Sequence, residues 1–338
     1  MSMSKRIALI FDCDGTISED TTTKLLKHVG LTPRTFWSDA RRLERDGWEP
    51  ALAYMHLLIQ YARKKPITAA TFKKVAKKVV LSGGIPKFFF DMKAYVARRF
   101  GRQGVSLDVF VVSGGIEEIL RATALGRRGR SDQPAVDDFF GCRFAYDDSG
   151  NITFPRVAIT FTEKTKALFA INKGISSTEL AADPYRVNDH VSPDERQVSL
   201  KNMIYIGDGP TDVPCMSLLK QQGCEIFAVY TQPRQGILQS TNALARQGRF
   251  TRGPFKRDYR SGSDLRRALE GELEGYAERI ITEAAPFRKP AVRHDQGPTD
   301  STDTASAGGR GTSLRTRRRN RRGTVYSRRN LKRRGASN

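Results

Sequence analysis

The sequence has 338 residues, of which 38% are hydrophobic, and this is enough apolar material for the core of one large or two ordinary domains. No apolar run approaches the roughly 20 residues that cross a bilayer, and the run near the N-terminus is too short for a secretory signal, so we expect a soluble, cytoplasmic protein. The formal net charge is +22, and the four cysteines and four histidines are too scattered for a zinc site, a disulfide framework or a catalytic histidine.

Short apolar runs alternate with helical patterns along most of the chain. Buried strands are predicted at 4–12, 107–112, 202–206 and 225–230, and a hairpin is predicted at 144–154. Helices are predicted from Thr32-Pro33 onward and at 51–62, 68–80, 86–100, 116–125, 162–172 and 264–284. Strands that alternate with helices favour an α/β fold, with a doubly wound, mostly parallel sheet that is covered on both faces.

Three regions differ in composition. The helical block at 21–100 is too long for one crossover between strands, so we expect a helical cap with a connecting helix, inserted into a core made of 1–20 and 101–286. From 287 to 338 the chain is rich in Pro, Gly, Ser, Thr and Arg, and this composition predicts a disordered tail. The tail is strongly basic, because twelve lysines and arginines lie between 310 and 334 and no acid follows Asp303.

Polar, reactive side chains follow three of the predicted strands. Asp12 and Asp14 follow the first strand, Ser113 follows the second and Asp208 follows the third, each beside a glycine or a turn. The carboxyl ends of parallel strands meet at one edge of such a sheet, which is where these folds bind ligands. We therefore expect these side chains to converge on one crevice, although they are distant in the sequence.

A cation is expected among the acids of this crevice. The acids are Asp12, Asp14, Asp208 and Asp212. Without a cation they would repel one another, and their pKa values would rise. Mg²⁺ suits them, because it binds through one or two carboxylates, water and a substrate phosphate. Ser113 and the backbone N–H groups of Gly114 and Gly115 precede a predicted helix, and we expect them to form an anion site.

These residues resemble the four motifs of the haloacid dehalogenase-like hydrolases. Residues 12–16 match D-x-D-G-T, Ser113 matches the second motif, Lys164 the third, and residues 207–212 match G-D-G-x-x-D. The motifs occur in the family's order, and the likeness covers roughly residues 5 to 285. The helical insertion, the hairpin and the run at 202–215 are similar to the phosphoserine-phosphatase-like branch, which has a helical C1-type cap.

The resemblance implies a role for each motif residue. Asp12 would be the nucleophile that forms an aspartyl-phosphate, and Asp14 would be the general acid and base. The Mg²⁺ ligands would be Asp12, the backbone carbonyl of Asp14, Asp208 and Asp212, the last directly or through water. The phosphoryl oxygens would be bound by Ser113, Gly114 and Lys164. An acid at position 14 suits an alkoxide leaving group, and hence a phosphate ester.

Two positions leave alternatives open. Phosphoserine phosphatases carry a substrate-recognising Glu nine residues after the nucleophile, and the corresponding residue here is Thr21. Glu19 or Asp20, just before it, could substitute by a shift in register, but we expect phosphoserine not to be the substrate. Lys166 competes with Lys164, but residues two apart do not share a helix face. We therefore expect only one of them to reach the site, and we favour Lys164.

Two further features have plain structural interpretations. A second Ser-Gly-Gly, at 82–84, follows a lysine-rich helical segment, and we expect it to end that helix rather than to bind substrate. The aromatic residues of the predicted cap are expected to form its core rather than a substrate pocket. They are Phe36, Trp37, Trp48 and Tyr54.

The leading hypothesis is a magnesium-dependent phosphatase that hydrolyses a small phosphorylated metabolite. The alternatives are a phosphotransferase or a nucleic-acid 3′-phosphatase that holds its polymer with the tail, and a non-catalytic nucleic-acid-binding protein on the same scaffold. The cations at 310–334 would contact nucleic acid or another anionic surface without sequence preference. The sequence indicates no oligomeric state.

Overall fold

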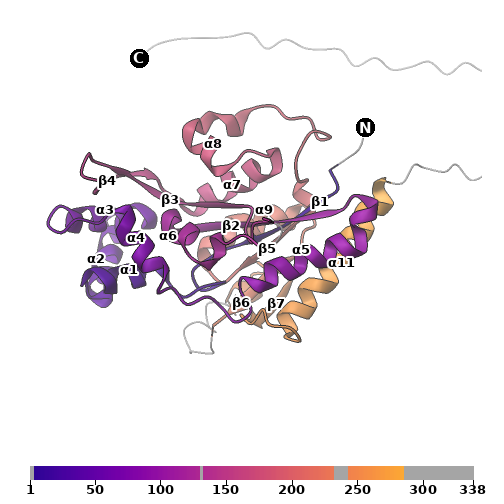
Figure 1. Ribbon diagram of the computed structural model, residues 1–338, viewed down its shortest axis with the longest axis horizontal. Helices are drawn as coiled ribbons and strands as arrows, with labels where there is room; N and C mark the ends of the chain where they lie inside the picture. Colours follow the sequence, from indigo (N-terminus) through magenta and orange to yellow (C-terminus); the bar gives the residue numbers. More distant parts are fainter. Residues whose placement is uncertain (1–3, 130–131, 232–242, 285–338) are drawn as a thin grey trace, which may run out of the picture. The chain divides into compact units, whose positions relative to one another are not determined.

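A sheet with the strand order β4-β3-β2-β1-β5-β6-β7 lies at the centre of the fold (Figure 1). The structure is a computed structural model that describes residues 4–129, 132–231 and 243–284. Its strands are β1 Arg6–Phe11, β2 Ser106–Ile116, β3 Asp138–Tyr146, β4 Ile152–Val157, β5 Met203–Gly207, β6 Ile226–Tyr230 and β7 Arg252–Lys256. Within the described residues only β4 runs antiparallel to its neighbour. The predicted α/β fold class is therefore confirmed, whereas the predicted tail at 287–338 lies outside the described residues.

The central strands are short apolar runs because both of their faces are covered. The last five residues of β1 and all of β5 are buried. Phe11, which ends β1, pairs with Val111 on one side and with Ile206 on the other. This register brings the residues that follow the three strands to the same edge of the sheet.

Strand β2 is longer than predicted. It continues through Ser113, Gly114 and Gly115, and Ile116 pairs with Cys142 of β3. The register shifts between Val112 and Ile116, as expected where glycines form a bulge in a strand. Ser113–Gly115 therefore belong to the end of β2, and the helix predicted at 116–125 begins just after the strand, as α6 at Glu117–Ala122. The anion site at these residues stays a prediction.

Helices cover both faces and the carboxyl edge of the sheet. They are α1 Thr21–Val29, α2 Pro33–Arg45, α3 Pro50–Ala62, α4 Ala69–Ala76, α5 Lys87–Phe100, α6 Glu117–Ala122, α7 Phe161–Lys173, α8 Ser177–Ala182, α9 Val213–Gln221 and α11 Asp264–Ala284. Short 3₁₀ turns occur at Gly101–Gln103, Ala124–Gly126, Pro184–Asn188, Leu200–Asn202 and Pro210–Asp212. Helices α5 and α11 lie side by side on one face (Figure 1), and Phe89 and Leu269 from these helices pack with Phe11 of β1. On the other face, Leu168 of α7 packs with Ile10.

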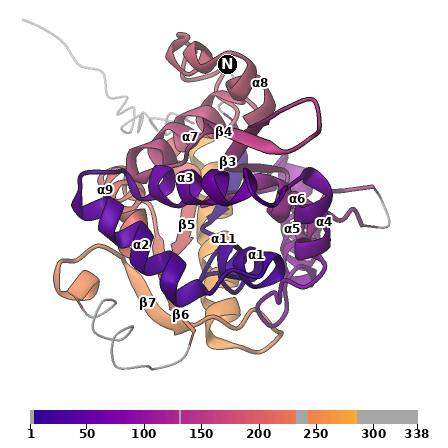
Figure 2. The ribbon, with the colours of Figure 1, turned by 90° about the vertical axis from the view of Figure 1, so that its left-hand side faces the viewer.

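Helices α1 to α4 form a cap at the carboxyl edge, in front of the sheet in Figure 2. Their apolar residues, among them Leu58, pack into one cluster that continues into β3 and α6 through Phe144 and Ile119. Phe36 and Tyr54 are buried in this cluster and Trp37 packs against it, as expected. The expectation for Trp48 was wrong, because this side chain is 38% exposed and lies against His56.

The hairpin predicted at 144–154 is confirmed, because β3 and β4 pair antiparallel across a turn at 147–151. Among the described residues, no helix is both long and apolar enough to cross a membrane. The four cysteines are free and buried. The division into a core at 1–20 and 101–286 and a cap at 21–100 stays a prediction; α5, the last helix of that range, packs on the sheet rather than with the cap cluster.

Candidate active site

The loop after β1 begins as a continuation of the strand. The Asp12 N–H donates to the carbonyl of Ile206 at 2.9 Å, which fixes this residue beside the end of β5. The next side chain, Cys13, points to the opposite side and packs in the core between the sheet and α5. The chain then turns back, because the carbonyl of Cys13 accepts hydrogen bonds from the N–H groups of Ile17 and Ser18 at 2.9 and 3.0 Å.

Gly15 lets this loop approach Asp208. Its φ is +83°, a conformation that residues with a side chain rarely adopt. A Cβ atom there would also lie 2.0 Å from Asp208 Oδ2. Two constraints therefore require a glycine at this position of the D-x-D-G-T stretch: the positive φ of the turn and the close approach of the Asp208 carboxylate.

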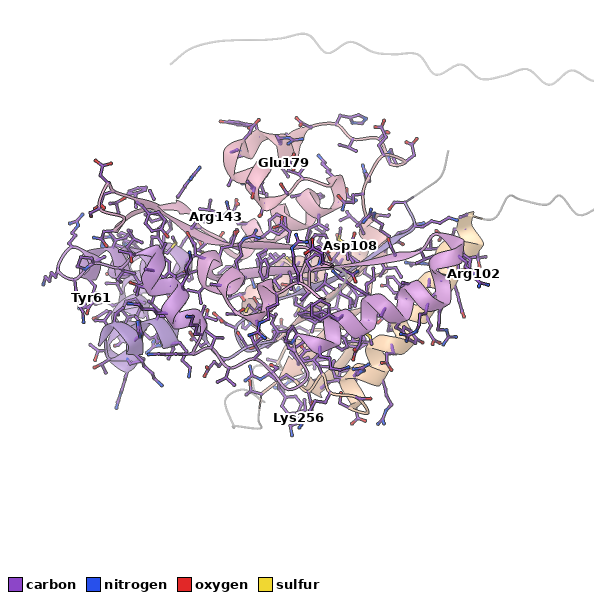
Figure 3. All side chains as sticks on the ribbon, viewed as in Figure 1. Tyr61, Arg102, Asp108, Arg143, Glu179 and Lys256 are labelled. Carbon is purple, nitrogen blue, oxygen red and sulfur yellow. The ribbon has the colours of Figure 1, made fainter. Side chains whose placement is uncertain are left out.

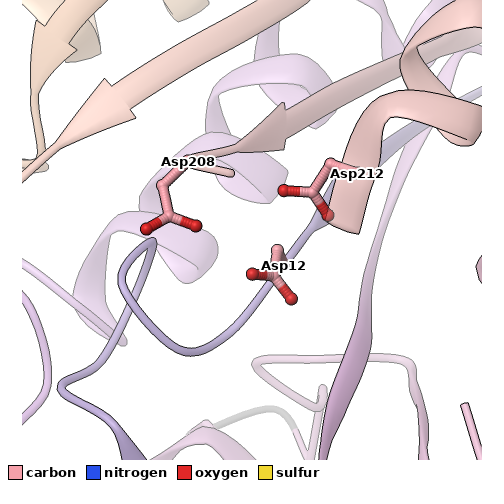
Figure 4. Close-up of side chains that lie close together, drawn as sticks. All are labelled: Asp12, Asp208 and Asp212. Carbon is pink, nitrogen blue, oxygen red and sulfur yellow. The ribbon is translucent and has the colours of Figure 1, made fainter. Parts of the chain in front are cut away.

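Three carboxylates meet at the ends of β1 and β5. Figure 4 shows Asp12, Asp208 and Asp212 directed at one space, and each offers an oxygen that lies within 4.8 Å of an oxygen from the other two. Asp12 is 5% exposed, Asp212 is fully buried, and Asp208 is partly exposed at the rim. The predicted convergence of these strand ends is thus a feature of the structure.

Lys164, on α7, provides the counter-charge. Its Nζ lies 2.8 Å from Asp12 Oδ1 and 2.7 Å from Asp212 Oδ1, and its side chain is 3% exposed. Tyr205 of β5 donates its hydroxyl to the same Asp212 oxygen at 2.7 Å. Lys166 does not reach the cluster, because it pairs with Glu163 on the outer side of α7 at 3.1 Å.

The charges of the cluster are compatible with a bound divalent cation. Burial raises the pKa of Asp12 to about 6, against the attraction of Lys164. Burial, with repulsion from Asp12 and Asp212, raises the pKa of Asp208 well above its ordinary value. Burial opposes the charge on Lys164, but the two neighbouring carboxylates outweigh it and raise the pKa of the lysine. Three carboxylates face one ammonium group, and oxygen donors of this kind fit Mg²⁺.

Asp14 lies outside this cluster and has different partners. The Thr21 N–H donates to its Oδ1 at 2.9 Å, and the Thr21 hydroxyl lies 3.2 Å from its Oδ2. Burial and the negative charge of Asp20 raise the pKa of Asp14 to about 7, although the hydrogen bonds from Thr21 lower it. Thr21 is the first residue of α1, so the first cap helix orients this carboxylate.

Ser113 lies beside Asp14, on the neighbouring strand. Both side chains lie next to Gly115, because a Cβ atom on this glycine would be 3.3 Å from Asp14 Oδ2 and 3.3 Å from Ser113 Oγ. Ser113 is 1% exposed, and its hydroxyl oxygen accepts from the Gly115 N–H at 3.0 Å. The carbonyl of Gly114 accepts from the hydroxyl of Tyr54 at 2.9 Å, so this glycine connects the cap to the sheet.

Comparison with known proteins agrees with the motifs. The family model for haloacid dehalogenase-like hydrolases matches residues 9–217. The chain belongs to this family.

Proteins similar to this chain differ considerably from it in sequence. An uncharacterized protein of Borreliella burgdorferi is 26% identical over 239 residues, which are 63% of this chain and 78% of that protein. A solved structure of a phospho-aspartyl intermediate analogue of phosphoserine phosphatase has a TM-score of 0.46 and 14% identity, and covers 79% of this chain and 99% of its own. A probable phosphoserine phosphatase from Vibrio cholerae has a TM-score of 0.41 and 13% identity, and covers 74% and 68%.

Two segments that sequence reasoning did not assign to the site support the loop with the family's first motif. Ser82, in the second Ser-Gly-Gly, donates its N–H to the carbonyl of Ile17 at 2.8 Å. Tyr259 is fully buried, and its hydroxyl lies 3.2 Å from the carbonyl of Thr16. Arg257 donates to the carbonyl of Ser18 at 2.5 Å. Residues 82–84 do not end α4 as predicted, because this helix already ends at Ala76. They support the loop that carries the first motif, through the hydrogen bond from Ser82 to Ile17.

Proposed function

We propose that this hydrolase is a Mg²⁺-dependent phosphatase, which cleaves a phosphate monoester through an aspartyl-phosphate on Asp12. The observation that carries the proposal is the contrast between two nearby carboxylates. Asp12 is paired with Lys164 among buried acids, whereas Asp14 is bound by Thr21 and has a pKa of about 7. Two carboxyl groups in different environments are suited to different steps of one reaction.

In the first step, a carboxylate oxygen of Asp12 attacks phosphorus and the bond from phosphorus to the ester oxygen breaks. The leaving oxygen needs a proton. Asp14 donates it, because with a pKa of about 7 it is protonated in a large share of molecules near neutral pH.

In the second step, water attacks the phosphorus of the aspartyl-phosphate. Asp14, now a carboxylate, accepts a proton from this water. The bond from phosphorus to the Asp12 oxygen breaks, and inorganic phosphate leaves. Both carboxyl groups return to their initial states.

The remaining residues bind and orient the phosphoryl group. Lys164 and Ser113 are almost completely buried, so their charge and hydroxyl would act on the phosphoryl oxygens with little screening by water. Asp12, Asp208 and Asp212 would hold Mg²⁺. When bound, the ion would neutralise negative charge on the phosphoryl group and on the acids around it.

We propose a small phosphorylated metabolite as the substrate, with phosphoserine disfavoured. Thr21 occupies the position at which the phosphoserine enzymes carry a substrate-binding Glu. Its N–H and its hydroxyl are both directed at Asp14. This position therefore supplies no negative charge to an amino group of the substrate.

Hydrolysis of a generic aryl phosphate tests the proposal. We expect turnover with Mg²⁺, loss of turnover in EDTA, and a fall of about a thousandfold or more in Asp12→Asn, which keeps the shape of the side chain. Asp39→Asn, on the outer surface of the cap, is the matched control and should behave like wild type. No turnover across a panel of phosphate esters, or an active Asp12→Asn variant, would refute the proposal.

A further inference from the structure

The cap carries a large, one-sided charge. From Pro50 to Phe90 the chain has eight lysines and arginines and no aspartate or glutamate. Over residues 21–80 the count is thirteen lysines and arginines against four acids. The proposed phosphatase reaction uses none of these cations.

Part of this charge gathers around the end of α1. The Nζ of Lys78, beyond the end of α4, lies 3.2 Å from His28 Nδ1. Lys65, which follows α3, donates to the carbonyl of Val29 at 3.2 Å. Burial, and then the charges of Lys78, Lys74 and Lys65, lower the pKa of His28. Three helices that are separate in the sequence thus bring cations to one place.

We call this the basic cap surface. Its centre is His28, Lys65, Lys74 and Lys78, and we count with it their neighbours in the sequence, Lys27, Lys64, Lys73 and Lys77. All seven lysines are exposed. Within the described residues none of them forms an ion pair, whereas the cap's ion pairs join Lys24 to Glu19 and Arg42 to Asp39. The fold therefore holds several like charges together without compensation, which favours an anionic partner.

We infer that the basic cap surface binds the phosphodiester backbone of nucleic acid without sequence preference. Lysines that contact phosphates supply affinity but do not identify bases. The nearby aromatic residue, Tyr61, is half-buried and its hydroxyl donates to the carbonyl of Val29, so it is not free to stack on bases. The sequence at 310–334, with its twelve cations, has the same sign of charge.

A bilayer fits this surface less well than nucleic acid does. Proteins that lie on anionic membranes combine cations with apolar side chains that insert below the headgroups. Val80, two residues after Lys78, is 61% exposed, whereas the cap's other exposed large apolar residues in the described chain, Trp48 and Leu52, lie at the start of α3, away from Lys64 and Lys65 at its end. One valine offers too little apolar area for insertion.

Helix α1 connects this surface to the site. Thr21, its first residue, binds Asp14, and His28 lies near its other end. At 1.5 Å of rise per residue the two are about 10 Å apart along the helix. Binding at the surface is measured without turnover, so its failure and the failure of the proposed phosphatase activity can be distinguished.

The test uses the full-length chain and labelled single-stranded RNA and DNA of unrelated sequences, followed by fluorescence anisotropy over a salt series. The variant is Lys65→Gln with Lys74→Gln and Lys78→Gln. We expect its Kd at low salt to be about tenfold weaker, or more, for every sequence. The slope of log K against log salt should fall by about 2, because three contacts at roughly 0.7 each are lost.

The matched control removes the same charge elsewhere. It is Lys5→Gln with Arg98→Gln and Arg102→Gln, at the end of the sheet far from the cap (Tyr61 and Arg102 in Figure 3). Its Kd should stay within about twofold of wild type, because salt screens distant charges. Exchanging the three cap lysines for arginine should preserve binding, which separates lost charge from a disturbed fold.

Three results would overturn the inference. The first is an equal loss in the cap variant and the control, which would assign binding to net charge alone. The second is no binding of RNA or DNA by the wild-type chain at low salt. The third is binding to vesicles rich in anionic lipid with no binding to either nucleic acid, which would make the partner a membrane.

Discussion

Thr21 shows how a single residue can connect the cap to the chemistry of the core. Its backbone N–H and its hydroxyl both contact Asp14, and both contacts favour the carboxylate form. The residue thus opposes the burial that raises the pKa of Asp14. Thr21 therefore orients Asp14, the proposed acid and base.

Thr21→Val removes the hydroxyl contact but keeps the shape and the N–H contact. The pKa of Asp14 should therefore rise above its present value of about 7. The high-pH arm of kcat/KM, where Asp14 loses the proton for the leaving group, should shift upward by up to about one pH unit. Thr22→Val, one residue on, is the control and should leave the profile in place. An unchanged or downward-shifted arm in Thr21→Val would contradict this assignment.

The raised pKa values of Asp12 and Asp14 also predict how pH affects the metal-free protein. Their values of about 6 and about 7 exceed the ordinary 3.8, so between these limits the folded chain holds protons that the unfolded chain has released. Their contribution to stability is fully present below pH 3.8 and is lost as pH rises to about 7.

Mg²⁺ should offset this loss, because it binds the deprotonated carboxylates. We expect Mg²⁺ to raise Tm more at pH 8 than at pH 5, as measured by thermal unfolding with Mg²⁺ and with EDTA. The increment should shrink in Asp12→Asn. An increment that is independent of pH, or larger at pH 5, would mean that these acids are not the ligands.

At the scale of elements, the sheet and its site edge were predictable from local patterns. Apolar runs identified β1, β2, β5 and β6, and parallel strands must bring their carboxyl ends together. The convergence of Asp12, Asp208 and Asp212 follows from that topology.

Other features depend on tertiary contacts that no local pattern encodes. Strand β7, with the sequence RGPFK, was missed because an edge strand with a proline and two cations lacks the apolar alternation of a strand. The extension of β2 through Gly114 and Gly115 depends on β3. The contacts of Tyr205 with Asp212 and of Tyr259 with Thr16 join residues whose side-chain directions depend on the completed fold.

The segment at 81–85 gives a prediction at this scale. Gly84 has a φ of +94°, and a Cβ atom there would lie 2.5 Å from the carbonyl carbon of Tyr259. Gly84→Ala should lower the free energy of unfolding by about 2 kcal/mol or more, because backbone strain and a backbone clash add. Urea denaturation measures the change. Gly83→Ala is the control, since its Cβ would meet a flexible Arg260 side chain at 3.2 Å. Equal effects at the two positions would argue against tight docking of this segment.

At the scale of the whole molecule, the residues of the fold and of the site belong to one unit, 1–287. A chain that ends at 287 should therefore keep its Tm to within about a degree, and its turnover of an aryl phosphate should be unchanged. It should bind nucleic acid more weakly, because fifteen lysines and arginines are removed. Thermal unfolding, turnover and anisotropy measure the three quantities. A large loss of small-substrate turnover would show that 288–338 takes part in catalysis.

The buried carboxylates of the site also bear on whether the site is in use. A chain that needed only to fold would be more stable with neutral side chains at Asp12 and Asp208, because burial and the neighbouring acids disfavour their charged forms. Under mutation without selection for activity, neutral replacements would be tolerated and the cluster would decay. The intact cluster, with Lys164 in place and Gly15 making room for Asp208, is the trace that selection for activity would leave.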